Sequence, residues 1–137
     1  MDPETLHIVD ASLQRCSREA RFLDLFYAKF LASSPKVQAR FAGTNLERQK
    51  RALRGSLWVI LLAAENEEKG PETYLASLAE MHSSRRLDIG AELYDLWLDN
   101  LLAAVAECDP EHTPQVRSAW ERVMMVGIHY MVTRYNR

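Results

Sequence analysis

The amino-acid sequence predicts an all-α fold of six or seven helices. Apolar residues recur every three or four positions along most of the 137-residue chain, as they do on one face of an α-helix. The five glycines and five prolines fall mainly between these periodic stretches. No stretch alternates apolar and polar residues beside a hairpin turn signal. The approximate helix spans are 3–18, 20–33, 35–41, 45–65, 71–83, 89–108 and 114–135.

Capping signals mark where most of these helices begin. Three starts pair a polar capping residue with proline at the first helical position, namely Asp2-Pro3, Ser34-Pro35 and Thr113-Pro114. Thr44 and Glu47 lie three positions apart and predict a capping box for the helix over 45–65. Asp88 is expected to cap the helix over 89–108.

The apolar faces of these helices are rich in aromatic and long aliphatic residues. The sets, in chain order, are Phe22, Phe26 and Phe30; Leu46, Leu53, Leu57 and Leu61; Leu75 and Leu78; Tyr94, Trp97, Leu101 and Val105; and Trp120, Val123, Gly127 and Met131. This spacing places each set on one side of its helix. We expect one domain over residues 1–137, long enough to bury a core without disulfide bonds.

Composition and charge narrow the class of protein. Hydrophobic residues make up 47% and charged residues 26%, values typical of a folded soluble domain. A net charge of −2 is too even a balance to indicate binding to nucleic acid or to an anionic membrane. Cys16 and Cys108 stand alone, which favours two reduced thiols in a cytoplasmic protein. The longest apolar run, over 57–64, is too short to span a membrane, and the N-terminal residues lack the features of a signal peptide.

Three polar side chains interrupt the predicted apolar faces. His82 follows Leu78 on one face near the end of its helix, Gln49 lies four positions before Leu53, and Tyr27 lies in an aromatic helix. Each has an ordinary interpretation, as a structural histidine, an exposed glutamine or a core tyrosine. The functional alternative for His82 is metal binding. A single histidine cannot complete a zinc site, but it can hold a haem iron because the porphyrin supplies four nitrogens.

In combination, these residues give the chain its resemblance to a known family. The matching elements are Phe26-Tyr27, Pro35, Phe41, Gln49-Lys50-Arg51-Ala52-Leu53, Met81-His82, Tyr94, Leu101-Leu102 and Ala119-Trp120. Their order and spacing resemble those of the globin family, most closely bacterial single-domain globins and the globin domain of flavohaemoglobins. The resemblance covers roughly residues 5–135. It implies a globin fold of six to eight helices that encloses a haem pocket.

The resemblance also implies roles for individual residues. His82 would be the proximal ligand of the iron of haem b (iron protoporphyrin IX), and Phe41 would pack flat against the porphyrin. Leu53 would form the apolar distal wall, whereas Ile89 and Tyr94 would line the proximal side. The remaining two residues, Tyr27 and Gln49, would donate hydrogen bonds to a bound gas, which count for more in a dry pocket. The expected gas ligands are dioxygen, carbon monoxide and nitric oxide.

The sequence departs from the pattern of these relatives in two places. They carry a glutamate in the last helix that partners the proximal histidine, and the matching position here is Tyr135. The loss of that carboxylate weakens the case for peroxidase-like chemistry. The segment between His82 and Tyr94 is about two residues longer than in those relatives. Within it, Arg85 and Arg86 could meet haem propionates or simply form a solvated basic corner.

Three functions are consistent with this pattern. The first is a bacterial haem protein that binds dioxygen and related gases reversibly. The second is a nitric oxide dioxygenase or peroxidase, which would need a separate reductase because the chain has no GxGxxG motif and no flavin domain. The third is a gas sensor acting through a partner protein, or a haem-free interaction module. The sequence leaves open whether the protein is a monomer or a homodimer.

Overall fold

The computed structural model describes residues 1–136 and confirms the all-α prediction. Seven helices follow one another without a strand among the described residues: α1 (Pro3–Arg18), α2 (Phe22–Ala32), α3 (Pro35–Phe41), α4 (Leu46–Glu65), α5 (Gly70–His82), α6 (Ala91–Cys108) and α7 (Pro114–Thr133). The predicted ends differ from these bounds by at most two residues. None of the helices within residues 1–136 is both long and apolar enough to cross a membrane.

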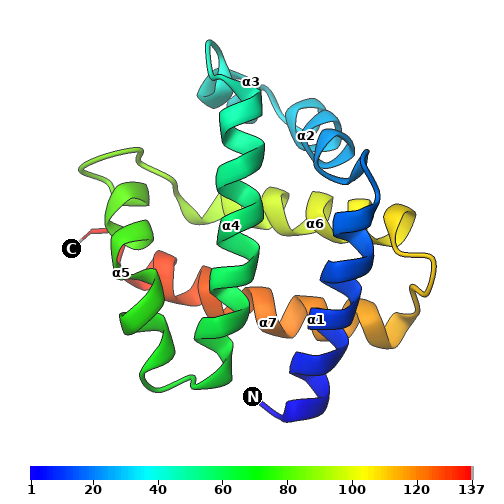
Figure 1. The fold of residues 1–137 in the computed structure, drawn as a ribbon. Coiled ribbons are helices and arrows are strands. Elements are labelled where there is room, and N and C mark those ends of the chain that lie inside the picture. Colours follow the sequence, from blue (N-terminus) through cyan, green and yellow to red (C-terminus); the bar gives the residue numbers. More distant parts are fainter. Residues whose placement is uncertain (137) are drawn as a thin grey trace.

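The helices form two crossing layers (Figure 1). Helices α1 and α4 lie across α6 and α7, α5 lies across the end of α7, and all three contact α7. Helix α2 packs on α6 at one end of the molecule, and the short α3 packs against α2. This arrangement brings α2, α3 and the first half of α4 together above α6, and residues of all four helices line one cavity.

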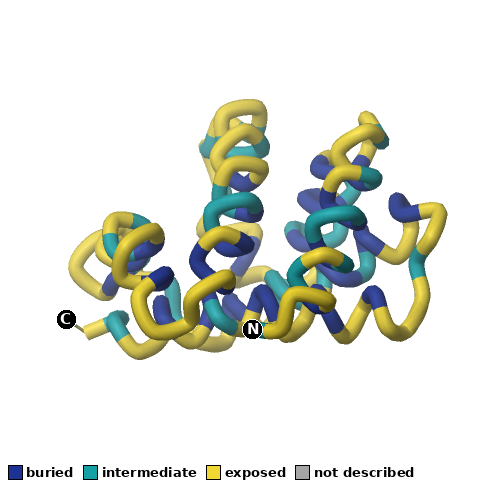
Figure 2. Tube along the Cα trace, turned by 60° about the horizontal axis from the view of Figure 1, so that its bottom comes forward, coloured by how far each residue is buried: buried dark blue, intermediate teal, exposed yellow. Residues whose placement is uncertain are grey.

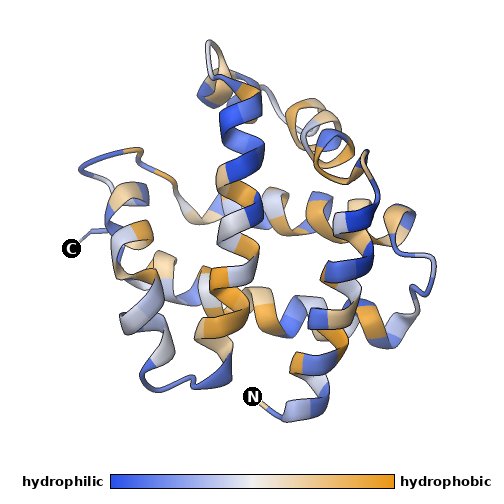
Figure 3. Ribbon diagram, viewed as in Figure 1, coloured by the Kyte–Doolittle hydropathy of each residue, from blue (hydrophilic) through white to orange (hydrophobic). Residues whose placement is uncertain are grey.

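The core is built from the faces that the apolar spacing predicted. Trp120, Phe26, Leu57 and Leu101 are fully buried. Figure 2 shows buried residues on the inward sides of the helices and exposed residues outside. Hydropathy changes along α4, whose first half is hydrophilic and whose second half is hydrophobic (Figure 3). The second half of α4 therefore packs in the core, and the first half bounds a more open region.

Four of the helices have an N-cap residue whose side chain accepts a hydrogen bond from a backbone N–H of the first turn. Asp2 accepts a hydrogen bond from the Thr5 backbone at 3.0 Å, and Ser34 and Thr113 accept equivalent bonds at 3.1 and 3.2 Å, as predicted. The prediction for Thr44 is wrong. Asn45 lies directly before the helix, and its side-chain oxygen accepts from the Arg48 backbone at 3.1 Å.

The prediction that Asp88 caps α6 is also wrong. The cap is Gly90, which makes no side-chain hydrogen bond because it has no side chain. Asp88 instead adopts a left-handed backbone conformation with φ of 56°, and its carboxylate accepts a hydrogen bond from the Tyr135 hydroxyl. Tyr135 itself lies two residues beyond the end of α7 at Thr133, although the predicted span of 114–135 included it.

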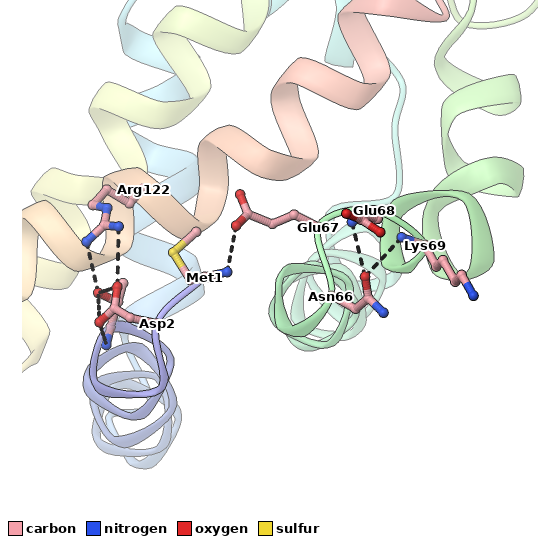
Figure 4. A network of polar contacts seen from close by, with 8 residues as sticks. Met1, Asp2, Asn66, Glu67, Glu68, Lys69 and Arg122 are labelled. Atoms are coloured by element: carbon pink, nitrogen blue, oxygen red, sulfur yellow. Dashed lines mark hydrogen bonds and ion pairs between the residues drawn. The ribbon is translucent and has the colours of Figure 1, made fainter.

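Polar contacts at the start of α1 join three parts of the chain (Figure 4). The amino group of Met1 forms an ion pair with Glu67 at 2.6 Å, in the connection between α4 and α5. Arg122 of α7 pairs with Asp2 at 3.3 Å. Within the connection, Asn66 accepts hydrogen bonds from two backbone N–H groups at 3.1 Å and so stabilises the turn.

Candidate functional site

A cavity of about 310 Å³ lies between α4 and α6 and is also lined by residues of α2, α3, α5 and α7. Its size falls within the range of small-molecule sites, and most of its lining residues are apolar. The structure brings all seven predicted site residues to this one cavity: Tyr27, Phe41, Gln49, Leu53, His82, Ile89 and Tyr94. They come from five helices and one loop, so only the folded chain places them together.

His82 ends α5, and its side chain is half-buried in the cavity wall. Its Nδ1 lies 2.8 Å from the Leu78 carbonyl oxygen. A carbonyl can only accept, so Nδ1 carries the proton and donates, and Nε2 carries the lone pair. Burial lowers the pKa of His82, opposed by this hydrogen bond. The ring is therefore neutral near pH 7, which is the form that binds metal ions.

Tyr27 lies on α2 and is buried among the aromatic residues of the cavity. Burial raises the pKa of its phenol to about 12, so the hydroxyl keeps its proton at neutral pH. That hydroxyl donates to the backbone carbonyl of Gln49 at 3.4 Å, which is long for an O–H···O bond. A weakly engaged donor at a cavity wall can turn toward a ligand at little cost.

Phe41 is the last residue of α3 and is held by other aromatic rings. Tyr27 and Phe30 contact it edge-to-face, with centroid distances of 6.0 and 5.7 Å. Phe30 in turn stacks on Phe26 at 5.3 Å. These contacts fix the half-buried Phe41 ring at the cavity.

The opposite wall is formed by α6, α7 and the loop before α6. Tyr94 is buried, and its hydroxyl donates to the sulfur of Met131 at 3.5 Å. Ile89 lies half-buried beside it in the cavity lining. Tyr135 stands where the globins that the sequence resembles carry the glutamate that partners the proximal histidine. In this chain, His82 donates its Nδ1 hydrogen bond to a backbone carbonyl, and the Tyr135 hydroxyl donates to the Asp88 carboxylate.

Sequence reasoning missed the charged residue of this cavity. Arg40, on the last turn of α3, is the single charged side chain among the cavity-lining residues that the structure describes. In the sequence it is one arginine among many near helix ends, and no motif singles it out. Arg85 and Arg86, the two arginines that the sequence suggested, are exposed and do not line the cavity. Arg86 pairs instead with Glu80 at 3.7 Å.

Comparison with known proteins places the fold in a family. No family model matches the sequence, and no curated protein matches it significantly. The chain is similar to a solved crystal structure, with 40% sequence identity and a TM-score of 0.89, covering 97% of this chain and 99% of that one. That protein, from Pseudomonas aeruginosa PAO1, is described as structurally highly homologous to a human hemoglobin.

The chain belongs to the globin family. Its all-α architecture is the globin fold, which confirms the resemblance drawn from the sequence. The globin fold implies a haem cofactor and a role in gas binding.

Proposed function

We propose that this globin holds haem b in the cavity between α4 and α6 and binds dioxygen and related diatomic gases reversibly. The observation that carries the proposal is the convergence of the seven sequence-predicted residues on one mainly apolar cavity. When bound, haem would supply an iron centre that can bind a diatomic gas. The described side chains fit the group, because one neutral imidazole faces an apolar lining with an aromatic ring beside it.

His82 is the proposed iron ligand, through Nε2. The hydrogen bond from Nδ1 to the Leu78 carbonyl fixes both the tautomer and the orientation of the ring. Ile89 and Tyr94 exclude water from this side of the cavity, and Phe41 supplies a flat apolar surface. Exclusion of water slows loss of the reduced state of the metal and so favours reversible binding.

Tyr27 and Gln49 are the proposed hydrogen-bond donors to the gas, and Leu53 is the apolar wall between them. All three line the cavity from α2 and α4. Dioxygen held by a haem would be a good hydrogen-bond acceptor, and carbon monoxide would be a poorer one. The phenol of Tyr27 and the amide of Gln49 therefore favour dioxygen over carbon monoxide.

The partner of His82 favours gas binding over oxidative catalysis. A carboxylate at Nδ1 would make the imidazole more basic and push electron density toward the metal. A backbone carbonyl does this more weakly. A nitric oxide dioxygenase that relies on a separate reductase is the alternative, and catalytic consumption of nitric oxide with such a reductase would favour it.

Two free, buried cysteines support a reducing, cytoplasmic setting.

Reconstitution with haem tests the proposal. We expect the purified protein to take up haem with a sharp Soret band, and His82→Ala to lose or shift that band. Added imidazole should restore it, because a free ligand can occupy the position that the side chain leaves. His129→Ala is the matched control, since His129 is exposed on α7 and does not line the cavity. A wild-type protein without a Soret band, or an unchanged band in His82→Ala, would count against the proposal.

A further inference from the structure

Arg40 lies where an apolar cavity meets solvent. It is the cavity's one charged lining side chain within residues 1–136, and its side chain is 39% exposed. The cavity around it is otherwise formed by aromatic, aliphatic and uncharged polar residues. A ligand with both a large apolar part and a carboxylate would place its charge at this point, because the carboxylate stays solvated there while the apolar part is buried.

The guanidinium of Arg40 is held in place by the loop that follows His82. Nη1 donates to the carbonyl of Leu87 at 2.5 Å, and Nη2 donates to the carbonyl of Asp88. Nη2 also lies 3.5 Å from the Asp88 carboxylate, which in turn accepts the Tyr135 hydroxyl. The arginine therefore bridges α3 to the loop between α5 and α6, and its orientation is set before any ligand arrives.

These contacts leave donors of Arg40 unused. A guanidinium has five N–H donors, and three acceptors engage it among the described residues. At least two N–H groups therefore remain for a carboxylate. The planar fork of arginine suits carboxylate recognition better than the point charge of lysine does.

Two neighbouring cations are engaged elsewhere, and a third, Arg85, is exposed and does not line the cavity. Lys36, one turn earlier on α3, pairs with Glu92 at 3.0 Å and does not line the cavity. Arg86 pairs with Glu80 at 3.7 Å and also lies outside it. Arg40 is thus the cation best placed to meet a carboxylate that leaves the cavity.

We propose that Arg40 binds a propionate carboxylate of the cofactor while it holds the loop after His82 in place. The inference rests on the proposed function, because haem carries two propionate groups on an apolar ring. It adds a positioning role: one side chain joins the cofactor's charged edge to the loop that follows the proposed iron ligand.

The rate of haem transfer to excess apomyoglobin tests this role without reference to gas binding. We expect Arg40→Gln to release haem roughly 3- to 10-fold faster, since a half-exposed charge-assisted contact is lost. Lys36→Gln removes the same charge from the same helix and should release haem at the wild-type rate. Arg86→Gln should do the same. An unchanged rate in Arg40→Gln, or faster release in Arg86→Gln alone, would overturn the assignment.

Haem dimethyl ester separates propionate binding from loop support. The ester lacks the carboxylate charge, so Arg40→Gln should speed its release much less than it speeds release of haem, and any remaining effect comes from the lost loop contacts. If Arg40→Gln speeds release of the ester as much as of haem, the arginine acts through the loop and the propionate role is wrong. Arg40→Lys, which keeps the charge, provides a second variant if Arg40→Gln does not fold by circular dichroism; it should release haem at an intermediate rate. A wild-type protein that binds neither haem nor its ester would refute the proposed function itself.

Discussion

Tyr27 is the residue whose substitution most directly tests the proposed gas-binding side of the cavity. It is buried and protonated and makes one long hydrogen bond, to the Gln49 backbone at 3.4 Å. Tyr27→Phe should speed dioxygen release about tenfold if the hydrogen bond to dioxygen contributes about 1.4 kcal/mol. Stopped-flow measurement of dissociation from the haem-loaded protein gives the rate. Carbon monoxide release should change little, because that ligand accepts hydrogen bonds poorly.

Tyr130→Phe is the matched control for this prediction. Its hydroxyl donates to Glu72 at 2.6 Å, and the residue lies outside the cavity lining. Both substitutions remove one phenolic oxygen from a buried tyrosine. Equal dioxygen off-rates in Tyr27→Phe and wild type would remove Tyr27 from the distal role.

The sequence was informative at the residue scale where chemistry and spacing coincide. Residues such as Tyr27 and His82 stand out because each places a polar group on an apolar helix face. Arg40 did not stand out, because an arginine on the last turn of a helix is ordinary. Its importance arises from the path of the loop over 83–90, where Asp88 adopts φ of 56°. Such a conformation is unusual for a residue other than glycine, and no local sequence pattern predicts it.

At the scale of helices, a close backbone contact joins α4 to the start of α5 at Gly70. A Cβ atom at Gly70 would lie 2.1 Å from the carbonyl oxygen of Ala63, which belongs to the α4 backbone. Backbone cannot move aside as a side chain can. Gly70→Ala should therefore lower the free energy of unfolding by about 3 kcal/mol or more, measured by urea denaturation.

Two other glycines serve as comparisons for Gly70→Ala. A Cβ at Gly127 would meet the flexible Ile60 side chain at 3.1 Å, so Gly127→Ala should cost less. Gly55 is exposed within α4 and has no atom within 4 Å of a built Cβ. Gly55→Ala should stabilise the protein by up to about 1 kcal/mol, because alanine favours the helix. A Gly70→Ala variant as stable as Gly127→Ala would contradict the account of this contact.

The helices themselves were predictable because local signals agree with the fold. Apolar spacing and the caps at Asp2, Ser34 and Thr113 each point to the same elements. The two incorrect cap predictions, at Thr44 and Asp88, fall in the segments that precede α4 and α6. Both segments contribute residues to the cavity lining. There, the three-dimensional contacts decide which residue begins the helix. Thr44 is drawn into the turn after α3 by a backbone bond to Phe41 at 3.0 Å, so Asn45 caps α4.

At the scale of the whole molecule, one buried polar network joins α1 to the region between α6 and α7. Asp109 is buried and accepts from Ser12 at 2.6 Å and from Arg15 at 2.6 and 2.9 Å. The indole of Trp120 donates to Ser12 at 2.8 Å. These contacts link residues about a hundred positions apart, and every member has a partner. The network therefore fixes α1 against the rest of the core.

Asp109 should make the stability of the molecule depend on pH. Burial alone would raise the pKa of Asp109, but hydrogen bonds from Arg15 and Ser12 overcome it and hold the pKa below its ordinary value of 3.8. A carboxyl with a lowered pKa in the folded state stabilises the protein above about 3.8, and that stabilisation is lost as the pH falls through the folded value. Asp109→Asn should therefore lower the free energy of unfolding by about 1–3 kcal/mol at pH 7.

The same substitution should matter less in acid. As the pH falls below about 3.8 and through the lower folded pKa, the wild-type carboxyl takes up a proton and comes to resemble the amide, so the two stabilities should converge. Urea denaturation followed by circular dichroism, at pH 7 and at an acid pH below this range, measures the difference. Asp99→Asn, on the exposed face of α6, is the control and should change little at either pH. A deficit in Asp109→Asn that is equally large in acid would show that the network stabilises the fold by shape and not by the charge of its carboxylate.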